Sequence, residues 1–553
     1  MVVVRKILNC EVPYQKKTGL TYEDGIWKGE CVEHPEGHWR YGEKILRCLR
    51  DYPDRIGQVD AKTGEEDTLR NIEDRSVKCA LWMKKQGVKP GDIIALCTHN
   101  QLNSAIPLLA SLFLGAVCNP WWETYLEEDL IIYFLNHTEP KVIFTNEESG
   151  PFIQNIVKKV QSPAKVIVLG KVPSMQSLQE ILDQQNNEQV QSFECERIET
   201  ADQPAMLIYT SGSTGRPKSV LLSYGSLTAG VGNTEVDGAT GARGFWGSSF
   251  CWISAVIGMM ICFVKGATAV VYPAPSEADI CRLIEKYKIN WIILGTGSIN
   301  RLCNTEEAST CDMSSVDLLF FSGAIVKHDI EKFLLKTFPN ASIHQVYGAT
   351  EFGGAVTISK ITDDSKPGTC GKITNNVEIK VIDRSTGKIL GPNEEGEICV
   401  KSPFMMQEYF KNPEATAFVL DSEGWYHSDD LGYYDEDGSF YIIDRLKELI
   451  KCKLFDIAPG PIEQCIGEHP CVAEVAVIAK PYTLDREQPM AFVTKLPGKE
   501  VSEKDIIELV ESKLSDRMRL SGGVKFLDQM PYTASGKIAK KKLRDLARLI
   551  AQE

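Results

Sequence analysis

The sequence of 553 residues lacks the marks of a disulfide-bonded, zinc-knuckle or nucleic-acid-binding protein. Its 17 cysteines are an odd number and form no CxxC pair, which argues against a disulfide framework and favours reduced thiols. Lys and Arg total 61 against 75 Asp and Glu, giving a net charge of −14. This charge argues against non-specific binding to nucleic acid or to anionic membranes.

Long hydrophobic runs and targeting signals are also scarce. The most apolar stretch, residues 250–264 (FCWISAVIGMMICFV), is shorter than the roughly 18–20 residues of a spanning helix, so we expect a buried core helix or pocket wall. The N-terminal MVVVRKILNC does not have the order of a secretory signal. We expect a cytoplasmic protein. A peroxisomal location is the alternative, although the chain does not end in Ser-Lys-Leu.

The length predicts roughly two to four domains, and the pattern of apolar residues predicts an α/β fold. Residues 75–87 have helical spacing, residues 88–98 turn into a short buried strand, and residues 104–117 are an apolar helix. Four short β-rich runs lie between helical stretches and suit parallel strands with helices on both faces. They are KVIFT (141–145), KVIVLG (165–170), ATAVVY (267–272) and NWIILG (290–295).

The pattern changes near Val377. EIKVID, GEICV and FYIID are alternating strands separated by turns, one of them Asp435–Gly438, which predicts antiparallel hairpins or a small barrel. We predict a large N-terminal domain, residues 1–444, of αβ layers with a small β-barrel-like subdomain. A small, mobile α+β domain, residues 445–553, follows it.

Residues 209–220, YTSGSTGRPKSV, are a candidate phosphate-binding loop. They do not form a P-loop, because Gly212 and Gly215 are three apart and Pro217, which has no N–H, precedes Lys218. The glycines allow sharp turns, and the hydroxyls and Lys218 can contact phosphate oxygens. Taken alone, the stretch is as typical of a Ser/Gly surface turn as of a phosphate-binding loop.

Further motifs occur in a fixed order after this loop. They are VYGATE (346–351), WYHSDDLG (425–432), DRLKELIK (444–451) and TASGK (533–537). With the loop, and over residues from about 69 to 548, they resemble the adenylate-forming superfamily of acyl-CoA synthetases, coumarate–CoA ligases and luciferases. The chain looks most like the insect acyl-CoA synthetase branch.

The resemblance implies ATP, Mg²⁺ and coenzyme A as cofactor, metal and cosubstrate, and a small-molecule carboxylic acid as substrate. It implies that one set of residues binds the nucleotide: Thr210, Ser211, Gly212, Ser213, Thr214, Gly215, Lys218, Gly323, Tyr347, Gly348, Asp430 and Arg445. Within this set the loop would hold the β- and γ-phosphates, Tyr347 would stack on adenine, and Asp430 would accept hydrogen bonds from the ribose.

The resemblance also implies the catalytic residues. Thr350 would contact the α-phosphate and Glu351 would bind Mg²⁺. Lys537 would bridge the carboxylate and the α-phosphate. Lys447 would be the hinge about which the small domain rotates, bringing the region of Lys451 forward for the thioester step.

Trp252, Ser254, Ala324 and Ala355 are the candidate acid pocket. Trp252 resembles the aromatic gate of fatty acyl-CoA synthetases, and the apolar run after it favours an aliphatic acid. A tryptophan packed in the core is the alternative reading.

Several positions depart from the pattern of the superfamily. Ser219 and Asp429 stand where its members have glycine, and Asp429 adds negative charge near phosphate. Leu454 also replaces a glycine, whose backbone would lie against the pantetheine arm of CoA, so the leucine could block it. Pro461 likewise replaces a usual glutamate, and we expect the changes at Leu454 and Pro461 to affect the thioester step more than adenylation.

The sequence therefore predicts an AMP-forming acid–thiol ligase that makes an acyl-adenylate and then an acyl-CoA from a medium- or long-chain fatty acid. The alternatives are a luciferase-like monooxygenase and a catalytically impaired nucleotide- or acyl-binding relative. The oligomeric state does not follow from the sequence.

Overall fold

The structure is a computed structural model that describes residues 19–32, 37–123, 126–210, 216–231, 242–324, 326, 328–452, 455–483, 486–532 and 538–551. The chain divides into two compact units, which are described separately. Unit 1 comprises Met1–Tyr22, Trp27–Glu378 and Lys401–Trp425, and unit 2 comprises Glu23–Ile26, Ile379–Val400 and Tyr426–Glu553. Unit 2 thus contains the proposed C-terminal domain together with the strands that precede it, and the boundary at residue 444 stays a prediction.

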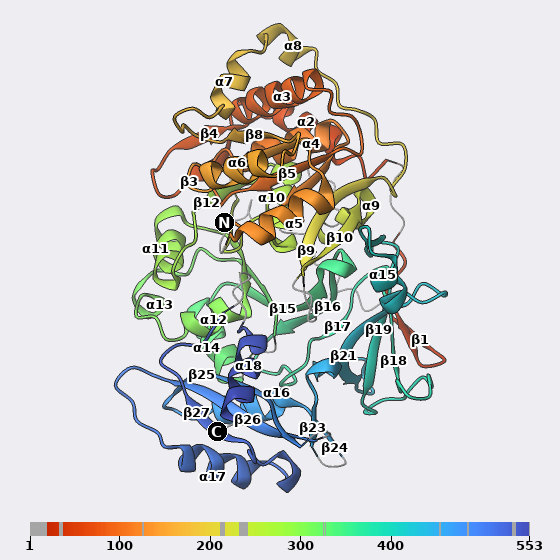
Figure 1. The fold of residues 1–553 in the computed structure, drawn as a ribbon, viewed down its shortest axis with the longest axis vertical. Helices are drawn as coiled ribbons and strands as arrows, with labels where there is room; N and C mark the ends of the chain where they lie inside the picture. The colour runs from red at the N-terminus through yellow and green to blue at the C-terminus, as the bar shows by residue number, and fades with distance from the viewer. Residues whose placement is uncertain are drawn as a thin grey trace. The chain divides into compact units, whose positions relative to one another are not determined.

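Unit 1 is built on two large sheets (Figure 1). The first has nine strands in the order β17-β16-β15-β14-β13-β11-β12-β3-β4. Its strands are β3 (Ile56–Asp60), β4 (Glu66–Thr68), β11 (Arg243–Trp246), β12 (Thr268–Val271), β13 (Trp291–Gly295), β14 (Leu318–Ser322), β15 (Ser342–Ala349), β16 (Gly354–Ile361) and β17 (Lys372–Ile373). From β3 to β15 neighbouring strands are parallel, as the β-rich runs at 267–272 and 290–295 predict.

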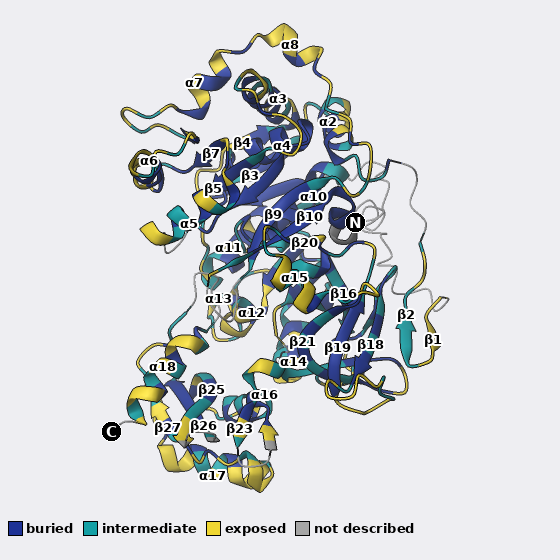
Figure 2. Cartoon of the chain, turned by 45° about the vertical axis from the view of Figure 1, so that its right-hand side comes forward, coloured by how far each residue is buried: buried dark blue, intermediate teal, exposed yellow. Residues whose placement is uncertain are grey.

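The second sheet has seven strands in the order β20-β10-β9-β6-β5-β7-β8. They are β5 (Ile93–Cys97), β6 (Val117–Pro120), β7 (Val142–Thr145), β8 (Lys165–Val168), β9 (Pro204–Thr210), β10 (Lys218–Ser223) and β20 (Glu408–Tyr409). Strands β5 to β9 are joined by parallel pairing, and β10 is antiparallel to both β9 and β20. The strands are mostly buried (Figure 2), which explains why they read as continuous apolar runs.

Helices cover the two sheets because apolar residues recur on one side of each. They are α2 (Tyr41–Asp51), α3 (Leu69–Lys85), α4 (Ala105–Phe113), α5 (Glu128–Thr138), α6 (Gly150–Lys159), α7 (Leu178–Asp183), α8 (Asn187–Gln191), α9 (Tyr224–Val231), α10 (Ile253–Lys265), α11 (Glu277–Tyr287), α12 (Thr296–Leu302), α13 (Glu307–Thr310), α14 (His328–Thr337) and α15 (Pro413–Val419). Residues 253–264 of the apolar run belong to the 13-residue helix α10, largely buried as predicted. In the described part of the chain, no helix combines the length and the hydropathy that crossing a bilayer requires.

Unit 2 contains antiparallel strands followed by a small α+β region. Strands β18 (Glu378–Ile382), β19 (Gly396–Lys401), β21 (Tyr426–Tyr434) and β22 (Phe440–Arg445) are consecutive in a six-stranded sheet that also includes β1 (Thr21–Glu23) and β2 (Ile26–Lys28). The predicted turn at Asp435–Gly438 joins β21 to β22. The remaining elements are β23 (Ile450–Cys452), β24 (Phe455–Ile457), α16 (Pro459–Gly467), β25 (Val472–Thr483), β26 (Arg486–Lys495), α17 (Glu503–Lys513), β27 (Gly523–Phe526) and α18 (Lys540–Ile550).

His344 gives unit 1 a predicted sensitivity to acid. It lies on β15, only 3% exposed, and burial together with the nearby Lys360 lowers its pKa from 6.5 to about 4. At a pH between these two pKa values, this histidine is protonated in the unfolded chain but not in the folded one. The free energy of unfolding therefore has its full value above pH 6.5 and decreases as the pH falls towards 4. The loss between pH 7 and pH 5 is about 2 kcal/mol.

We therefore expect His344→Asn to show a smaller fall in Tm between pH 7 and pH 5 than the unmodified protein, measured by scanning fluorimetry. His469→Asn, at a partly exposed histidine of unit 2, is the control and should keep the full fall. An equal fall in all three proteins would contradict the assignment.

Candidate active site

Strands β9 and β10 hold the two ends of the predicted phosphate loop. Thr210 ends β9, Lys218 begins β10, and the two residues pair directly across the strands. The Thr210 hydroxyl donates to the Lys218 carbonyl at 3.5 Å. Ser211, Gly212, Ser213, Thr214 and Gly215 lie outside the described residues, so their contact with phosphate stays a prediction.

Tyr409 connects Lys218 to the predicted magnesium ligand. The Lys218 ammonium lies 4.7 Å from the centre of the Tyr409 ring, within cation–π range. The Tyr409 hydroxyl donates to Glu351 Oε1 at 3.0 Å, and the backbone N–H of Met406 donates to the Glu351 carbonyl at 2.8 Å. Sequence reasoning missed Tyr409, because β20 reaches β10 by a pairing across almost 190 residues that no local pattern indicates.

The VYGATE motif lies at the carboxyl end of β15. A register shift between Tyr347 and Gly348 interrupts the pairing with β16, and Thr350–Phe352 then forms a short 3₁₀ helix. A Cβ on Gly348 would lie 2.3 Å from the Gly354 carbonyl oxygen, so the close approach of the two strands requires glycine. Tyr347 is half-buried against Phe352, with ring centres 6.0 Å apart.

Gly323 and Ala324 follow β14 at the same edge of the sheet, because β14 and β15 are parallel. Gly323 has φ +118°, in the region that favours glycine. Thr296 holds the next residue: its hydroxyl donates to the Ala324 carbonyl at 2.9 Å and accepts from the Ala324 N–H at 3.2 Å. Ligands of open α/β sheets bind at this carboxyl edge.

Trp252, Ser254 and Ala355 also lie near strand ends. Trp252 is half-buried and precedes the first turn of α10. Ser254 Oγ is 2.9 Å from Ser248 Oγ, and Ala355 pairs with Gly348 at the start of β16. The four candidate pocket residues thus stand at the carboxyl edge of the nine-stranded sheet or on segments adjoining it, and their contact with an acid stays a prediction.

Two buried polar groups adjoin the segment before Trp252. Glu123 Oε2 and Asn100 Oδ1 are buried without a hydrogen-bond partner, while Asn100 Nδ2 donates to the Ser248 carbonyl at 2.9 Å. Burial raises the pKa of Glu123, and a hydrogen bond with Ser249 opposes that rise. Sequence reasoning missed both residues, and an unpaired buried acceptor is costly unless a ligand donates to it.

In unit 2, a bulge in β21 displays the aspartates of the WYHSDDLG motif. Glu397 pairs with Leu431 and Cys399 with His427, so that Ser428, Asp429 and Asp430 stand opposite the single residue Ile398. The Ser428 hydroxyl donates to the Ile398 carbonyl at 2.7 Å and accepts from the Asp430 N–H at 3.0 Å. Bulges of this kind redirect side chains and are frequent beside active sites.

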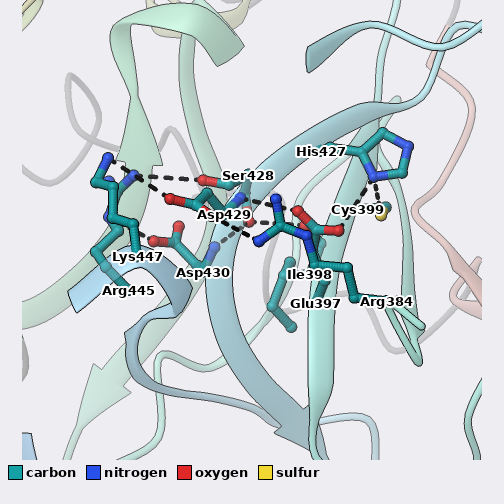
Figure 3. Close-up of polar contacts among 10 residues, drawn as sticks. All are labelled: Arg384, Glu397, Ile398, Cys399, His427, Ser428, Asp429, Asp430, Arg445 and Lys447. Carbon is teal, nitrogen blue, oxygen red and sulfur yellow. Dashed lines mark hydrogen bonds and ion pairs between the residues drawn. The ribbon is translucent and has the colours of Figure 1, made fainter. Parts of the chain in front are cut away.

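Asp430 and Arg445, both predicted nucleotide ligands, form an ion pair (Figure 3). They are cross-strand partners of β21 and β22, with Arg445 Nε 2.6 Å from Asp430 Oδ1. Arg445 also donates to the Ser428 carbonyl at 3.3 Å. Asp430 is only 4% exposed, and its contact with a ribose stays a prediction.

Asp429 is paired rather than free. Its φ of +60° is left-handed, a conformation that aspartate tolerates better than most residues. Its carboxylate lies 3.0 Å from Arg384 Nη1 and 3.6 Å from Lys447 Nζ, the predicted hinge lysine (Figure 3). The extra negative charge therefore has two cationic partners within unit 2.

Of the remaining predicted residues, Lys451 lies on β23 with an exposed side chain, and its N–H donates to Glu487 Oε2 at 2.8 Å. Lys537 and Leu454 lie outside the described residues.

Comparison with known proteins decides the family. The sequence profile of the AMP-binding enzyme family matches residues 46–410, and that of the AMP-binding enzyme C-terminal domain matches residues 461–537. The chain belongs to this family, the adenylate-forming superfamily.

The curated relatives of this AMP-binding enzyme include luciferases and CoA ligases. Luciferin 4-monooxygenase of Photuris pensylvanica is 31% identical over 93% of this chain and 96% of its own length. The 4-coumarate–CoA ligase 4 of Arabidopsis thaliana is 29% identical over 88% of this chain and 87% of its own length.

Solved structures agree with the fold. An anthranilate CoA ligase in complex with anthranoyl-AMP superposes with a TM-score of 0.83 at 21% identity, covering 93% of this chain and 98% of that one. The luciferase-like enzyme of the nonluminescent mealworm Zophobas morio is 29% identical, with a TM-score of 0.69 over 77% of this chain and 99% of that one.

Asp429→Gly tests whether the extra carboxylate weakens nucleotide binding. Glycine accepts the left-handed φ, and losing one partly exposed charge, already paired with Arg384 and Lys447 and worth about 0.5–1 kcal/mol, should raise ATP affinity about two- to fivefold. Asp429→Asn is the matched variant, since asparagine also tolerates this backbone but carries no charge. Tighter ATP binding in both, by calorimetry, would assign the effect to charge; unchanged affinity in both would contradict it.

Tyr409→Phe tests the support of Glu351. The variant keeps the ring beneath Lys218 but removes the donor to the carboxylate, a hydrogen bond to a charged group worth about 1.5–3 kcal/mol. We expect the Mg²⁺ concentration needed for half-maximal pyrophosphate release to rise at least about threefold. Tyr434→Phe, which removes a hydroxyl bonded to the Leu390 carbonyl in unit 2, should leave the Mg²⁺ dependence unchanged. If the two variants needed the same Mg²⁺ concentration, the proposed role of Tyr409 in supporting Glu351 would be contradicted.

Proposed function

We propose that this AMP-binding enzyme is an ATP-dependent carboxylate–CoA ligase that acts through an acyl-adenylate. The observation that carries the proposal is the contact series from Lys218 through Tyr409 to Glu351. It connects the end of the candidate phosphate loop to a carboxylate at the carboxyl edge of the nine-stranded sheet. A cation and a metal-binding carboxylate held together in this way suit a triphosphate with its magnesium ion.

The first step would join the acid to AMP. An oxygen of the substrate carboxylate attacks the α-phosphorus of ATP, the bond to the β-phosphate oxygen breaks, and pyrophosphate leaves. Both reactants are anions, so positive groups must compensate the charge that gathers in the transition state. Lys218 would serve the leaving phosphates, Thr350 the α-phosphate, and Lys537 the incoming carboxylate.

Glu351 fits the magnesium ion that this chemistry uses. It offers hard carboxylate oxygens, it is half-exposed, and its orientation is held by the Tyr409 hydroxyl. Mg²⁺ commonly takes one or two protein carboxylates and completes its shell with water and phosphate. Bound there, the ion would neutralise phosphate charge.

The second step would transfer the acyl group to a thiol. The sulfur of CoA attacks the acyl carbon, AMP leaves, and the thiol proton passes to solvent or to a base. Lys447 would be the hinge for this step and Lys451 would lie near the thiol, as the resemblance to the superfamily implies.

A medium- or long-chain fatty acid is the proposed substrate. The support is the apolar helix α10 following Trp252, with Val256, Met259 and Met260 all buried in it. Glu123 and Asn100, beside the segment that leads into this helix, add unpaired acceptors. An aliphatic acid carrying a hydroxyl could donate to them, so hydroxylated fatty acids belong among the compounds tested.

A luciferase-like monooxygenase is the second candidate, supported by the 31% identity to luciferin 4-monooxygenase over most of both chains. Both activities begin with an adenylate, so they diverge only at the second step. An added luciferin would give light and CO₂ in the monooxygenase and neither in the ligase.

The deciding experiment incubates the purified chain with ATP, Mg²⁺ and a panel of fatty, hydroxy-fatty and aromatic acids, with and without CoA. Mass spectrometry records AMP, acyl-adenylate and acyl-CoA together. We expect acyl-CoA from aliphatic acids, and Lys537→Ala should slow AMP formation about 100- to 1,000-fold, the cost of removing a charge-stabilising donor. Lys525→Ala, at an exposed lysine on β27, is the control and should retain activity.

Other products would overturn the proposal in distinct ways. Acyl-adenylate without acyl-CoA would mean that the thiol route is closed, the effect expected of Leu454. ATP binding without AMP from any acid would identify a binding protein that does not turn over. Acyl-CoA from aromatic acids alone would reject the fatty acid while keeping the ligase.

A further inference from the structure

Glu397, Cys399 and His427 form a compact cluster that the proposed ligase chemistry does not use (Figure 3). Glu397 and Cys399 are two residues apart on β19 and project from the same face, and His427 is the direct cross-strand partner of Cys399 on β21. Their ligating atoms all lie within 4.8 Å of one another. Glu397 and Cys399 are buried, whereas the His427 side chain is 30% exposed.

The contacts converge on one atom. His427 Nδ1 lies 3.6 Å from Cys399 Sγ and 3.2 Å from Glu397 Oε2. One ring nitrogen carries at most one proton, so it can donate to only one of these two neighbours at a time. A cation that accepts electron pairs from nitrogen, sulfur and oxygen together would satisfy all three groups.

Two of the three spacings, those from His427 Nδ1 to Cys399 Sγ and to Glu397 Oε2, match those of a tetrahedral zinc ion. Bonds of about 2.3 Å to sulfur and about 2.0–2.1 Å to nitrogen and oxygen place sulfur about 3.6 Å and oxygen about 3.3 Å from the nitrogen. The separations in the protein are 3.6 and 3.2 Å. The set of one thiolate, one imidazole and one carboxylate is also one that Zn²⁺ accepts and that Mg²⁺ and Ca²⁺ do not.

The surroundings orient the carboxylate towards this point. Glu397 Oε1 accepts the backbone N–H of Asp429 at 3.2 Å, which directs Oε2 to His427. Arg384 and Lys380 act on Glu397 and Cys399 respectively as nearby positive charges. Both positive charges disfavour the binding of a cation at this point. The charge of Arg384 is partly compensated by Asp429, which pairs with it at 3.0 Å.

We propose that Glu397, Cys399 and His427 form a site for a thiophilic divalent cation, with Zn²⁺ as the ion of best-matched chemistry. Binding exchanges protons for the metal: the Cys399 thiol loses its proton to solvent, and His427 loses one if it was charged. Water would take the fourth position on the exposed side of His427. The bound ion would tie β19 to β21 across the pair Cys399–His427.

Cobalt substitution tests the site, because Co²⁺ takes the same ligands and reports a thiolate bond through a near-ultraviolet charge-transfer band. The full chain is used without an affinity tag and in a Cys31→Ser background, which removes an exposed thiol. We expect one equivalent of Co²⁺ to give the band and stoichiometric Zn²⁺ to abolish it. Cys399→Ser and His427→Gln should each weaken binding at least about tenfold and lose or diminish the band.

Cys118→Ser is the matched control, since Cys118 is another fully buried strand cysteine, on β6; it should keep the band. Zn²⁺ should raise Tm in the control and in the parent protein but not in His427→Gln. Because the His427 side chain is partly exposed, we expect His427→Gln to fold, so the site can still be tested if the buried change Cys399→Ser prevents folding. The proposal is overturned if the parent protein with Co²⁺ shows no thiolate band. It is also overturned if the His427→Gln variant binds Zn²⁺ as tightly as the parent protein does.

Discussion

The close approach of β15 and β16 determines where the candidate active site lies. Gly348 faces the Gly354 carbonyl, and Gly353, with φ +73°, would place a Cβ 2.3 Å from the Phe404 carbonyl oxygen. These contacts leave no room for side chains, so the segment from Tyr347 to Glu351 must lie directly against the chain that carries Tyr409. Backbone packing thus positions Glu351, the proposed magnesium ligand, and its tyrosine partner.

Much of the fold could be predicted from periodicity alone. Buried parallel strands are continuous apolar runs, which explains why the stretches at 141–145, 165–170, 267–272 and 290–295 all became strands. Helix α10 and the Asp435–Gly438 turn follow from equally local signals. Local sequence signals suffice to predict these strands, this helix and this turn, because each element depends on the burial or turn geometry of only a few neighbouring residues.

The candidate site could be predicted only where the resemblance supplied motifs. Tyr409 comes to Glu351 through the pairing of β10 with β20, and Glu123 and Asn100 adjoin the segment before Trp252 from distant strands and loops. Sequence spacing contains no information about such register. The same limit applies to charge: Asp429 reads as an added negative group, but Arg384, 45 residues away, pairs with it.

The bulge in β21 relates two kinds of chemistry that the sequence does not connect. Without it, each residue of β21 would stand opposite one residue of β19, so the pair Glu397–Leu431 would bring Asp429, not His427, opposite Cys399. Instead three residues stand opposite Ile398, and Asp429 turns its N–H to Glu397 while Asp430 meets Arg445. The register that resumes at Cys399 and His427 then brings thiol and imidazole together. A single local irregularity therefore both presents the proposed ribose ligand and aligns the three groups of the proposed metal site, so the two sites share one strand and one backbone conformation.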